Sequence, residues 1–250
     1  MQYGICHLSI VPLRATADNV SEMVTQLLYG DHFKVLEHRK NWSKIRIAFD
    51  TTEGWVSNSQ FLIISEEAYQ QADTNKAIQN TSDLVAFVST DTDMLIPIVI
   101  GSTVQNIDLT THHFEGNFIG GIKEKGTLLD TALLYLNTPY LWGGKTPFGI
   151  DASGFTQMVY KINGYQLLRT SAQQASQGEP LSFIEESEAG DLAFFDNNEG
   201  VIDHVGIIMK NNYVIHVHGK VRIDRIDHTG IFNAETRSYT HQLRVIKKII

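Results

Sequence analysis

The feature that most constrains the fold of this chain is a change in the spacing of its apolar residues near residue 124. Before this point the apolar runs are short and β-rich, and turn signals such as Gly30-Asp31 and Gly54 separate them. This pattern predicts a small barrel or sandwich. After this point, apolar residues repeat at helical spacing from Leu128 to Leu136. The chain therefore joins a strand-rich first half to a second half that opens with helices.

The strand-rich half is expected to contain two parts separated by a connector. In the first part, 1–66, the segment NVSEMVTQLLYGD is interpreted as an extended loop or short helix that carries Glu22. Residues 67–83 are polar and permit a helix but offer almost no apolar face, so we interpret them as the connector. The second part, 84–123, is too short to bury much surface alone and is expected to pack on its neighbours.

The second half, 124–250, is expected to fold as one domain. Its first helix is predicted to end at Pro139, and its second helix is predicted to begin at Asp151 and to stop at Asn163-Gly164. The apolar face of this second helix consists of Phe155, Met158, Val159 and Ile162. Five predicted strands follow, from GDLAFFD to LRVIKKII. Helices followed by hairpin-connected strands indicate an α+β domain with an antiparallel sheet.

Charge and hydropathy exclude several classes of partner. Acidic residues outnumber basic ones by 28 to 20, and no Lys/Arg cluster is present to neutralise phosphates, so we predict no nucleic-acid partner. No window approaches the roughly 20 apolar residues of a membrane span. The start, MQYGICHLSI, lacks a basic region followed by an apolar one. We therefore expect a soluble cytoplasmic protein as written, or a periplasmic or secreted one if the sequence begins after a removed signal.

The single cysteine, Cys6, cannot form an internal disulfide. It lies in an apolar run with Ile5 and Leu8, so a buried, inert thiol is expected. Neither this cysteine nor the composition indicates the redox compartment or the oligomeric state.

The segment GGKTPFGIDASGF, residues 143–155, has the features that present a nucleophile at the start of a helix. Residue 152, where the reactive atom is expected, is an alanine. A cysteine there would feel the partial positive charge of unpaired backbone N–H groups, which lowers a thiol pKa. His204 opens one predicted strand and His216 lies in the next, so their imidazoles could be neighbours. Together these positions supply what nucleophilic catalysis requires: a nucleophile position, a base and an orienting group.

Each of these features has an alternative interpretation. A histidine at a strand entry is often a satisfied structural group, and His216 with His218 could form a surface or weak metal-binding feature. No Cys/His/Asp spacing resembles a structural zinc site, so we predict no metal and no cofactor. The glycine-rich loop could hold a phosphate, but it lacks the Lys-Ser/Thr step of a P-loop.

Four segments, PYLWGGKTPFGIDASGF, GDLAFFD, DHVGI and YVIHVHG, resemble in order and spacing the NlpC-type cell-wall peptidases. These are papain-like cysteine enzymes whose signature is an Asp-Cys-Ser-Gly step. The resemblance implies the α+β fold class, with a papain-like peptidase domain and its antiparallel sheet over 124–250. The first half resembles the bacterial SH3-like domains that precede this domain in many members. It implies two small SH3-like β-barrels, at 1–66 and, in reduced form, at 84–123.

The resemblance also assigns roles to individual residues. Ala152 takes the place of the nucleophile, His204 that of the general base, and His216 that of the group orienting the base. Tyr140 matches a tyrosine beside the nucleophile whose hydroxyl helps to bind substrate or the oxyanion, while Asp151 and Ser153 flank the nucleophile. Because alanine has no nucleophile, the chain as written is not expected to hydrolyse a peptide by the family mechanism.

This leaves two interpretations of Ala152. Either a catalytic cysteine was replaced deliberately, or the chain is a natural noncatalytic protein that binds murein peptides. The intact base, orienting residue and flanks favour the first interpretation.

Members with this arrangement resemble enzymes that cut murein stem peptides between D-glutamate and the diamino acid when the peptide begins with a free L-alanine. The partner implied is therefore the peptide L-Ala-γ-D-Glu-diamino acid, and the sequence does not distinguish diaminopimelate from lysine. A site that demands a free amino terminus must pair an ammonium with carboxylates. The resemblance assigns this task to Glu22 and places Trp55 as a wall of the cleft. The alternatives are a solvated surface acid for Glu22 and a barrel-core residue for Trp55.

The segment RTSAQQA, 169–175, has Thr170 where this subfamily often has an acid. The absence of an acid at position 170 either shifts the pairing of the substrate ammonium to Glu22 and Asp151 or weakens the requirement for a free amine. Ser171 is predicted to donate a hydrogen bond to the substrate.

Overall fold

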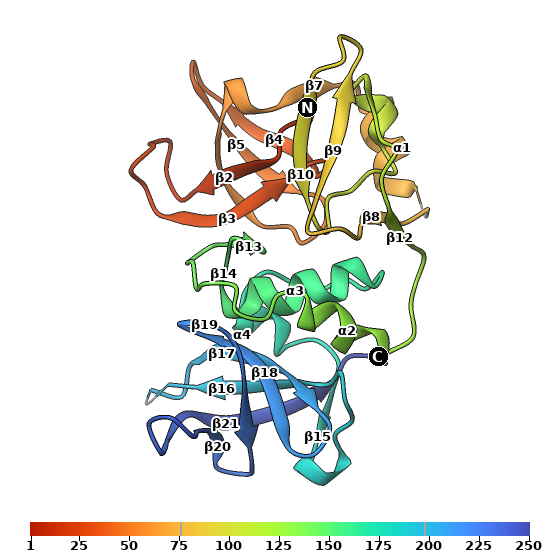
Figure 1. Ribbon diagram of the computed structural model, residues 1–250. Coiled ribbons are helices and arrows are strands. Elements are labelled where there is room, and N and C mark those ends of the chain that lie inside the picture. Colours follow the sequence, from red (N-terminus) through yellow and green to blue (C-terminus); the bar gives the residue numbers. More distant parts are fainter. Residues whose placement is uncertain (76, 198) are drawn as a thin grey trace. The chain divides into compact units, whose positions relative to one another are not determined.

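The computed structural model describes residues 1–75, 77–197 and 199–250. Contacts divide the chain into two compact units, each described here by itself. The first unit is Met1–Ile122 with Gly164–Gln166, and the second is Lys123–Asn163 with Leu167–Ile250 (Figure 1).

The first unit is built on a seven-stranded antiparallel sheet with the strand order β3-β2-β6-β5-β4-β1-β7. The strands are β1 (Gln2–Ile5), β2 (Ile10–Arg14), β3 (Met23–Leu28), β4 (His32–His38), β5 (Trp42–Ile47), β6 (Glu53–Ser57) and β7 (Leu62–Ile64), with the 3₁₀ turn η1 (Asn58–Gln60) before β7. Alternating residues such as Leu13, Phe33 and Ile45 point into one apolar core, which also buries Cys6. The barrel-like pattern expected from the sequence is therefore present.

The prediction of an extended loop or short helix over the segment that carries Glu22 is wrong. Residues after Glu22 form β3, which pairs with β2 and buries Leu27 against Val11 in register. The segment lacks clear alternation, and it is a strand because β2 supplies the hydrogen bonds and the apolar partners.

The remainder of the first unit contains the helix α1 and two small sheets, β10-β9-β11 and β12-β8. The elements are α1 (Glu66–Thr74), β8 (Gln79–Thr81), β9 (Val85–Thr90), β10 (Leu95–Val99), η2 (Ile107–Leu109), β11 (His112–His113) and β12 (Phe118–Gly120). Helix α1 does have an apolar face, contrary to expectation: Tyr69 and Ala72 are buried, and the Tyr69 ring stacks on Tyr3 with centroids 4.5 Å apart. Because one aromatic side chain supplies most of this face, the polar sequence around it hides the packing.

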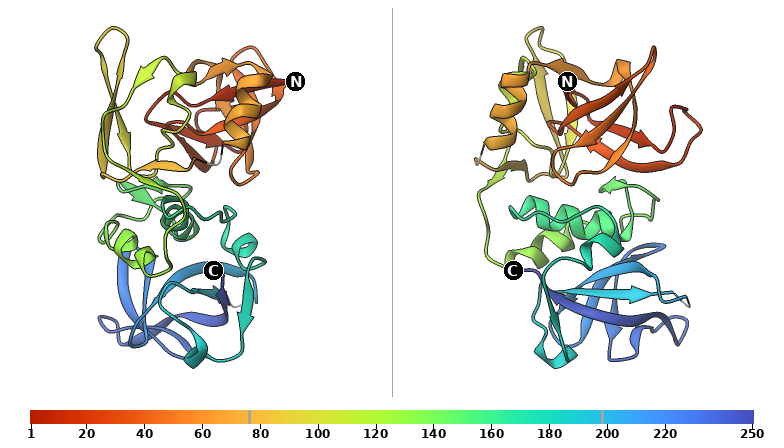
Figure 2. Two further views of the ribbon diagram at one scale, coloured as in Figure 1. Left: turned by 90° about the vertical axis from the view of Figure 1, so that its right-hand side faces the viewer. Right: turned by 180° about the vertical axis from the view of Figure 1, so that it is seen from behind.

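The second unit combines helices with a seven-stranded antiparallel sheet in the order β15-β21-β16-β17-β18-β19-β20. Its elements are α2 (Thr127–Leu133), β13 (Lys145–Thr146), β14 (Gly149–Ile150), α3 (Ala152–Ile162), α4 (Ser171–Gln174), β15 (Glu179–Leu181), η3 (Ile184–Glu186), β16 (Leu192–Asp196), β17 (Ile202–Met209), β18 (Tyr213–His218), β19 (Lys220–Ile226), β20 (Gly230–Asn233) and β21 (Ser238–Lys248). Strand β20 also pairs with β21, so the sheet closes into a barrel (Figure 2). The predicted α+β class with an antiparallel sheet is confirmed.

The two predicted helices of this unit begin as expected, but the first one is shorter. Helix α2 ends at Leu133 rather than near Pro139, and the chain continues in turns to Asn137, whose φ is 69°. Helix α3 has the predicted bounds, and every one of its residues is buried. It packs against α2 and against β17 and β18. Within the described ranges, no helix has the length and apolar character needed to span a membrane.

Candidate active site

Ala152 is the first residue of α3, and Asp151 fixes the helix start. The Asp151 carboxylate accepts a hydrogen bond from the Gly154 N–H at 2.6 Å, the usual role of an N-cap residue. It also accepts one from the Gly143 N–H at 2.9 Å, which ties the glycine-rich loop to the helix. The Ala152 side chain therefore occupies a defined position in the first turn, where it is 7% exposed and where the helix dipole favours negative charge.

Asp151 is also held by Arg169, which no sequence motif singled out. The guanidinium contacts both carboxylate oxygens, with Nη1–Oδ1 at 2.9 Å and Nη2–Oδ2 at 2.6 Å, and both side chains are nearly buried. Ser153 joins the pair, because its hydroxyl accepts from Arg169 at 3.0 Å. Asp151 is thus neutralised inside the protein, and the arrangement gives no support to its predicted alternative role of binding a substrate ammonium.

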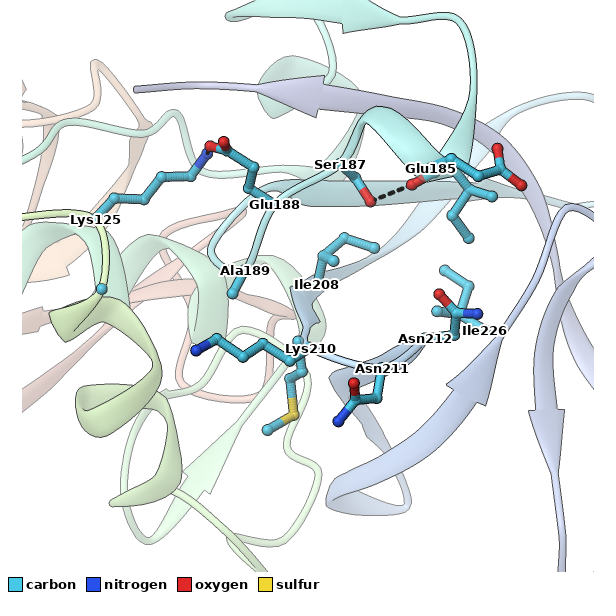
Figure 3. A pocket seen from close by; sticks show the side chains of 13 residues that line it. Lys125, Glu185, Ser187, Glu188, Ala189, Ile208, Lys210, Asn211, Asn212 and Ile226 are labelled. Carbon is cyan, nitrogen blue, oxygen red and sulfur yellow. Dashed lines mark hydrogen bonds and ion pairs between the residues drawn. The ribbon is translucent and has the colours of Figure 1, made fainter.

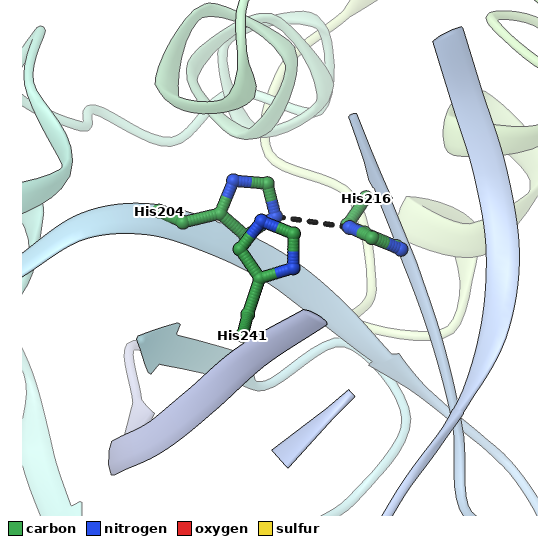
Figure 4. Close-up of side chains that lie close together, drawn as sticks. All are labelled: His204, His216 and His241. Carbon is green, nitrogen blue, oxygen red and sulfur yellow. Dashed lines mark hydrogen bonds between the residues drawn. The ribbon is translucent and has the colours of Figure 1, made fainter. Parts of the chain in front are cut away.

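His204 and His216 lie on neighbouring antiparallel strands, β17 and β18, where Gly206 is paired with His216. Their rings are in contact, with His204 Nε2 and His216 Nδ1 2.9 Å apart (Figure 4). This bond uses Nε2 of His204 and leaves Nδ1 on the opposite side of the ring. The structure thus brings together the two histidines that the sequence predicted to be neighbours.

Asp224 on β19 extends this contact into a chain of three polar groups. His216 Nε2 lies 3.0 Å from Asp224 Oδ2, and Arg222 holds the same carboxylate with bonds of 2.6 and 3.0 Å. A charged carboxylate only accepts, so His216 donates from Nε2 and accepts at Nδ1. His204 then donates from Nε2, and its Nδ1 carries a lone pair. The chain fixes His204 in the tautomer that a general base needs.

Burial keeps these imidazoles neutral. Desolvation, followed by the nearby His241, His216 and His218, lowers the pKa of His204 well below its usual value. Burial also lowers the pKa of His216 and outweighs the opposing effect of Asp224. Burial alone would raise the pKa of Asp224, but hydrogen bonds from His216 and Arg222 lower this pKa to about 2. The contact between His216 and Asp224 is therefore a hydrogen bond between a neutral ring and a carboxylate, and Arg222 supplies the compensating charge.

His241 on β21 is a third histidine at this place, and sequence reasoning missed it. Its ring stacks on that of His204, with centroids 3.9 Å apart and an interplanar angle of 20°. Burial, followed by the effect of His216 and His218, lowers the pKa of His241 to about 3. Three strands separate position 241 from 204 along the chain, but β21 and β17 both pair with β16 in the sheet, and this strand order brings the two rings together.

Helix α4 connects the start of α3 to β17. Gln174 donates from Nε2 to the Ser153 carbonyl at 2.9 Å and accepts from the Thr156 hydroxyl at 2.7 Å. Ser171 is buried, and its hydroxyl donates to the carbonyl of Asp203, the residue before His204, at 3.4 Å. Thr170, found where an acid was considered, is the N-cap of α4 and forms a reciprocal capping box with Gln173.

Tyr140 lies beside the start of α3 through its backbone, because it forms a parallel bridge with Ile150. Its side chain is 47% exposed, and partial burial together with Asp151 raises its pKa, so the hydroxyl stays protonated and able to donate.

Glu22 and Trp55 belong to the first unit, so their predicted place at the substrate stays a prediction. Glu22 is exposed, immediately before β3. Trp55 is only 8% exposed, and the Arg39 guanidinium lies 4.1 Å from its ring centroid. This environment fits the alternative interpretation of Trp55 as part of the barrel.

A cavity of about 620 Å³ in the second unit lies away from these residues (Figure 3). Its lining includes Ile208, four residues beyond His204 on β17 and hence about 13 Å along the strand. Of its two lining lysines, Lys125 and Lys210, Lys125 is paired with Glu188 at 3.1 Å and with Asp191 at 2.7 Å. The lining brings together none of the groups that the chemistry of the site requires.

Comparison with known proteins finds a family match within each of the two units. Residues 137–240 match the NlpC/P60 family, and residues 13–61 match the bacterial dipeptidyl-peptidase Sh3 domain. A γ-D-glutamyl-L-lysine dipeptidyl-peptidase of Bacillus subtilis (strain 168) is 37% identical over 99 residues, which cover 38% of this chain and 33% of that protein. Dipeptidyl-peptidase 6 of Lysinibacillus sphaericus is 26% identical over 245 residues, covering 82% of this chain and 83% of that protein.

The fold has a close counterpart among solved structures. An NlpC/P60 family protein from Bacillus cereus is similar with a TM-score of 0.81 at 18% identity, and the match covers 99% of each chain. This chain spans only part of the Bacillus subtilis relative. The chain carries an NlpC/P60 domain together with a bacterial dipeptidyl-peptidase Sh3 domain, and it is homologous to the γ-D-glutamyl-L-lysine dipeptidyl-peptidases.

Proposed function

We propose that this chain recognises murein stem peptides through the site at the start of α3, and that Ala152 prevents it from hydrolysing them. The observation that carries the proposal is the chain Asp224–His216–His204, with contacts of 3.0 and 2.9 Å. The two histidines of this chain lie on β17 and β18, which pack against α3. A buried, neutral, tautomer-fixed imidazole is prepared to accept a proton. Ala152, the first residue of α3, has no acidic proton that His204 could accept.

With a cysteine at 152, the same residues support peptide hydrolysis. His204 takes the thiol proton at Nδ1, and the helix N-terminus stabilises the thiolate. The thiolate attacks the γ-carbonyl carbon of D-glutamate, and His204 returns the proton to the leaving amine of the diamino acid. Water then hydrolyses the thioester and frees the dipeptide. Each step uses a group whose position is defined by hydrogen bonds in the second unit.

The substrate class we propose is L-Ala-γ-D-Glu-diamino acid with a free amino terminus. Support comes from the name of the Bacillus subtilis relative, which describes cleavage at a γ-D-glutamyl-L-lysine bond. Because Arg169 already neutralises Asp151, Glu22 is the proposed partner of the substrate ammonium. Tyr140 is the proposed hydrogen-bond donor to the peptide, whereas the single hydroxyl proton of Ser171 is used in its bond to the Asp203 carbonyl. A natural peptide-binding protein without catalysis is the second candidate, and Ala152 itself is the observation that favours it.

The test compares the chain with its Ala152→Cys variant on L-Ala-γ-D-Glu-meso-diaminopimelate and on the N-acetylated peptide, following release of the dipeptide by mass. Ala234→Cys is the matched control, because it adds a thiol at an exposed position after β20. We expect cleavage by Ala152→Cys alone, and only of the peptide with a free amine.

Two other outcomes would change the proposal. If Ala152→Cys fails to cleave while both proteins bind the peptide, the noncatalytic binding protein takes the place of the enzyme. If neither protein binds either peptide, the recognition of murein peptides itself is refuted.

A further inference from the structure

His204, His216 and His241 present a compact group of imidazole nitrogens at the end of the barrel (Figure 4). One donor nitrogen from each ring lies within 4.8 Å of the other two. We propose that these three histidines bind a divalent transition-metal ion of the zinc type. The sequence-based prediction of no metal depends on close spacings along the chain, whereas these ligands are on β17, β18 and β21.

Three neutral imidazoles are a ligand set that zinc, cobalt, nickel and copper share. The hard ions Mg²⁺ and Ca²⁺ prefer oxygen ligands, and the cluster offers them none.

His216 and His241 each use one ring nitrogen in a hydrogen bond to another residue, and the other nitrogen of each ring remains for the ion. His216 uses Nε2 for its bond to Asp224 at 3.0 Å, which leaves Nδ1. A carboxylate behind a ligating histidine is the arrangement that orients the ring and increases its basicity in metal sites. His241 Nδ1 lies 2.9 Å from the Thr240 hydroxyl, which leaves Nε2. In Figure 4 this half of the His241 ring faces His204.

Binding requires the His241 ring to tilt out of its stack on His204, because the in-plane lone pairs of two nearly parallel rings do not meet at one ion. Zinc–nitrogen bonds are about 2.0–2.1 Å, so in a tetrahedral site the ligand nitrogens lie about 3.3–3.4 Å apart, and a separation of 4.8 Å has to shorten by about 1.4 Å. The bond between His204 and His216 is replaced by the ion. The His204 proton moves from Nε2 to Nδ1, since the ion takes the Nε2 lone pair.

This proton shift has a functional consequence, which rests on the proposed function. A His204 ring protonated at Nδ1 and ligated at Nε2 cannot accept the proton of a thiol. Three protein ligands also leave one coordination position open. The ion is therefore an inhibitor of the Ala152→Cys enzyme and has no part in its chemistry.

Binding is tested on the chain as written, where no activity is involved. Co²⁺ is titrated while its visible absorption is followed, and Zn²⁺ is measured by calorimetry and by displacement of Co²⁺. We expect one ion per chain, bound in a site of low symmetry with intense visible bands. His241→Phe keeps the ring and its stacking but removes the ligand, and we expect it to weaken binding by at least about 10-fold. Asp224→Asn is expected to weaken it by about 10- to 100-fold.

His228→Asn is the control, because His228 is exposed on the loop between β19 and β20 of the same unit. It should leave the affinity unchanged, and the melting temperature of each variant shows that it is folded. The proposal is overturned if Co²⁺ produces no such bands at millimolar concentration, or if His241→Phe binds as tightly as the parent chain.

Inhibition of the Ala152→Cys enzyme separates this proposal from the proposed function. Zinc should stop cleavage, and His241→Phe should make the enzyme resistant. Cleavage without any ion binding refutes the metal site alone. Ion binding without any cleavage refutes only the hydrolytic function.

Discussion

The buried ion pair between Arg169 and Asp151 stabilises the start of α3. The free energy of unfolding that is lost when the pair is removed can be estimated from the structure. The two side chains are only 4% and 13% exposed and share two bonds of 2.9 and 2.6 Å. In Arg169→Met the carboxylate keeps its bonds from Gly143 and Gly154 but loses its counter-charge. Breaking a buried pair from one side costs about 3–5 kcal/mol. Because these two N–H donors remain, we expect the lower end, about 3 kcal/mol, or roughly a 10²-fold smaller folding constant.

The assay is urea unfolding of the chain, with the free energy assigned to the transition of the second unit. Arg46→Met is the matched control, because Arg46 is 48% exposed in its pair with Glu53, and such surface pairs contribute about 1 kcal/mol or less. The double variant Asp151→Asn/Arg169→Met removes both charges and keeps a residue that caps helices. We expect it to be more stable than Arg169→Met.

Two results would refute this reasoning. One is a loss below about 1 kcal/mol in Arg169→Met, which would mean that the carboxylate does not depend on its partner. The other is a double variant whose loss equals the sum of the two single losses, since a real pair makes the two changes non-additive.

Two further predictions concern the stability of the same unit. Gly154→Ala should lower the melting temperature although alanine favours a helix by about 1 kcal/mol, because the new Cβ would lie 2.4 Å from the Gly144 carbonyl oxygen; an unchanged or higher temperature contradicts this close approach of helix and loop. The free energy of unfolding should fall as the pH decreases below about 6.5, the ordinary pKa of histidine. The folded-state pKa values of His204, His216 and His241 are lowered, so the unfolded chain binds protons that the folded chain does not. Each ring contributes a slope of at most about 1.4 kcal/mol per pH unit, and urea midpoints at pH 7.5, 6.5 and 5.5 that do not change would contradict this expectation.

The features that the sequence predicted well depend on neighbours along the chain. Asp151 before an apolar run with helical spacing gives both the cap and the buried face of α3. Alternating residues give the strands of the barrel in the second unit, and with them the positions of His204 and His216 on adjacent strands.

Prediction from the local sequence pattern failed where a segment is stabilised by a partner that is distant in the sequence. The residues after Glu22 are a strand because β2 lies beside them, and α1 is held by a single buried ring, Tyr69, stacked on Tyr3. The β3 segment lacks clear alternation and the α1 segment is mostly polar, so the packing of each is decided by the elements it contacts.

The sequence by itself predicted Ala152 at the start of a helix and His204 and His216 on adjacent strands, as the structure has them. Only the tertiary structure decided the rest: that Arg169 neutralises Asp151, that Asp224 fixes the tautomers of His216 and His204, and that His241 stacks on His204. The physical reason is that caps and apolar periods are set by residues within a few positions of one another. Ion pairing and desolvation depend on groups that are distant in the sequence and meet only in the folded domain.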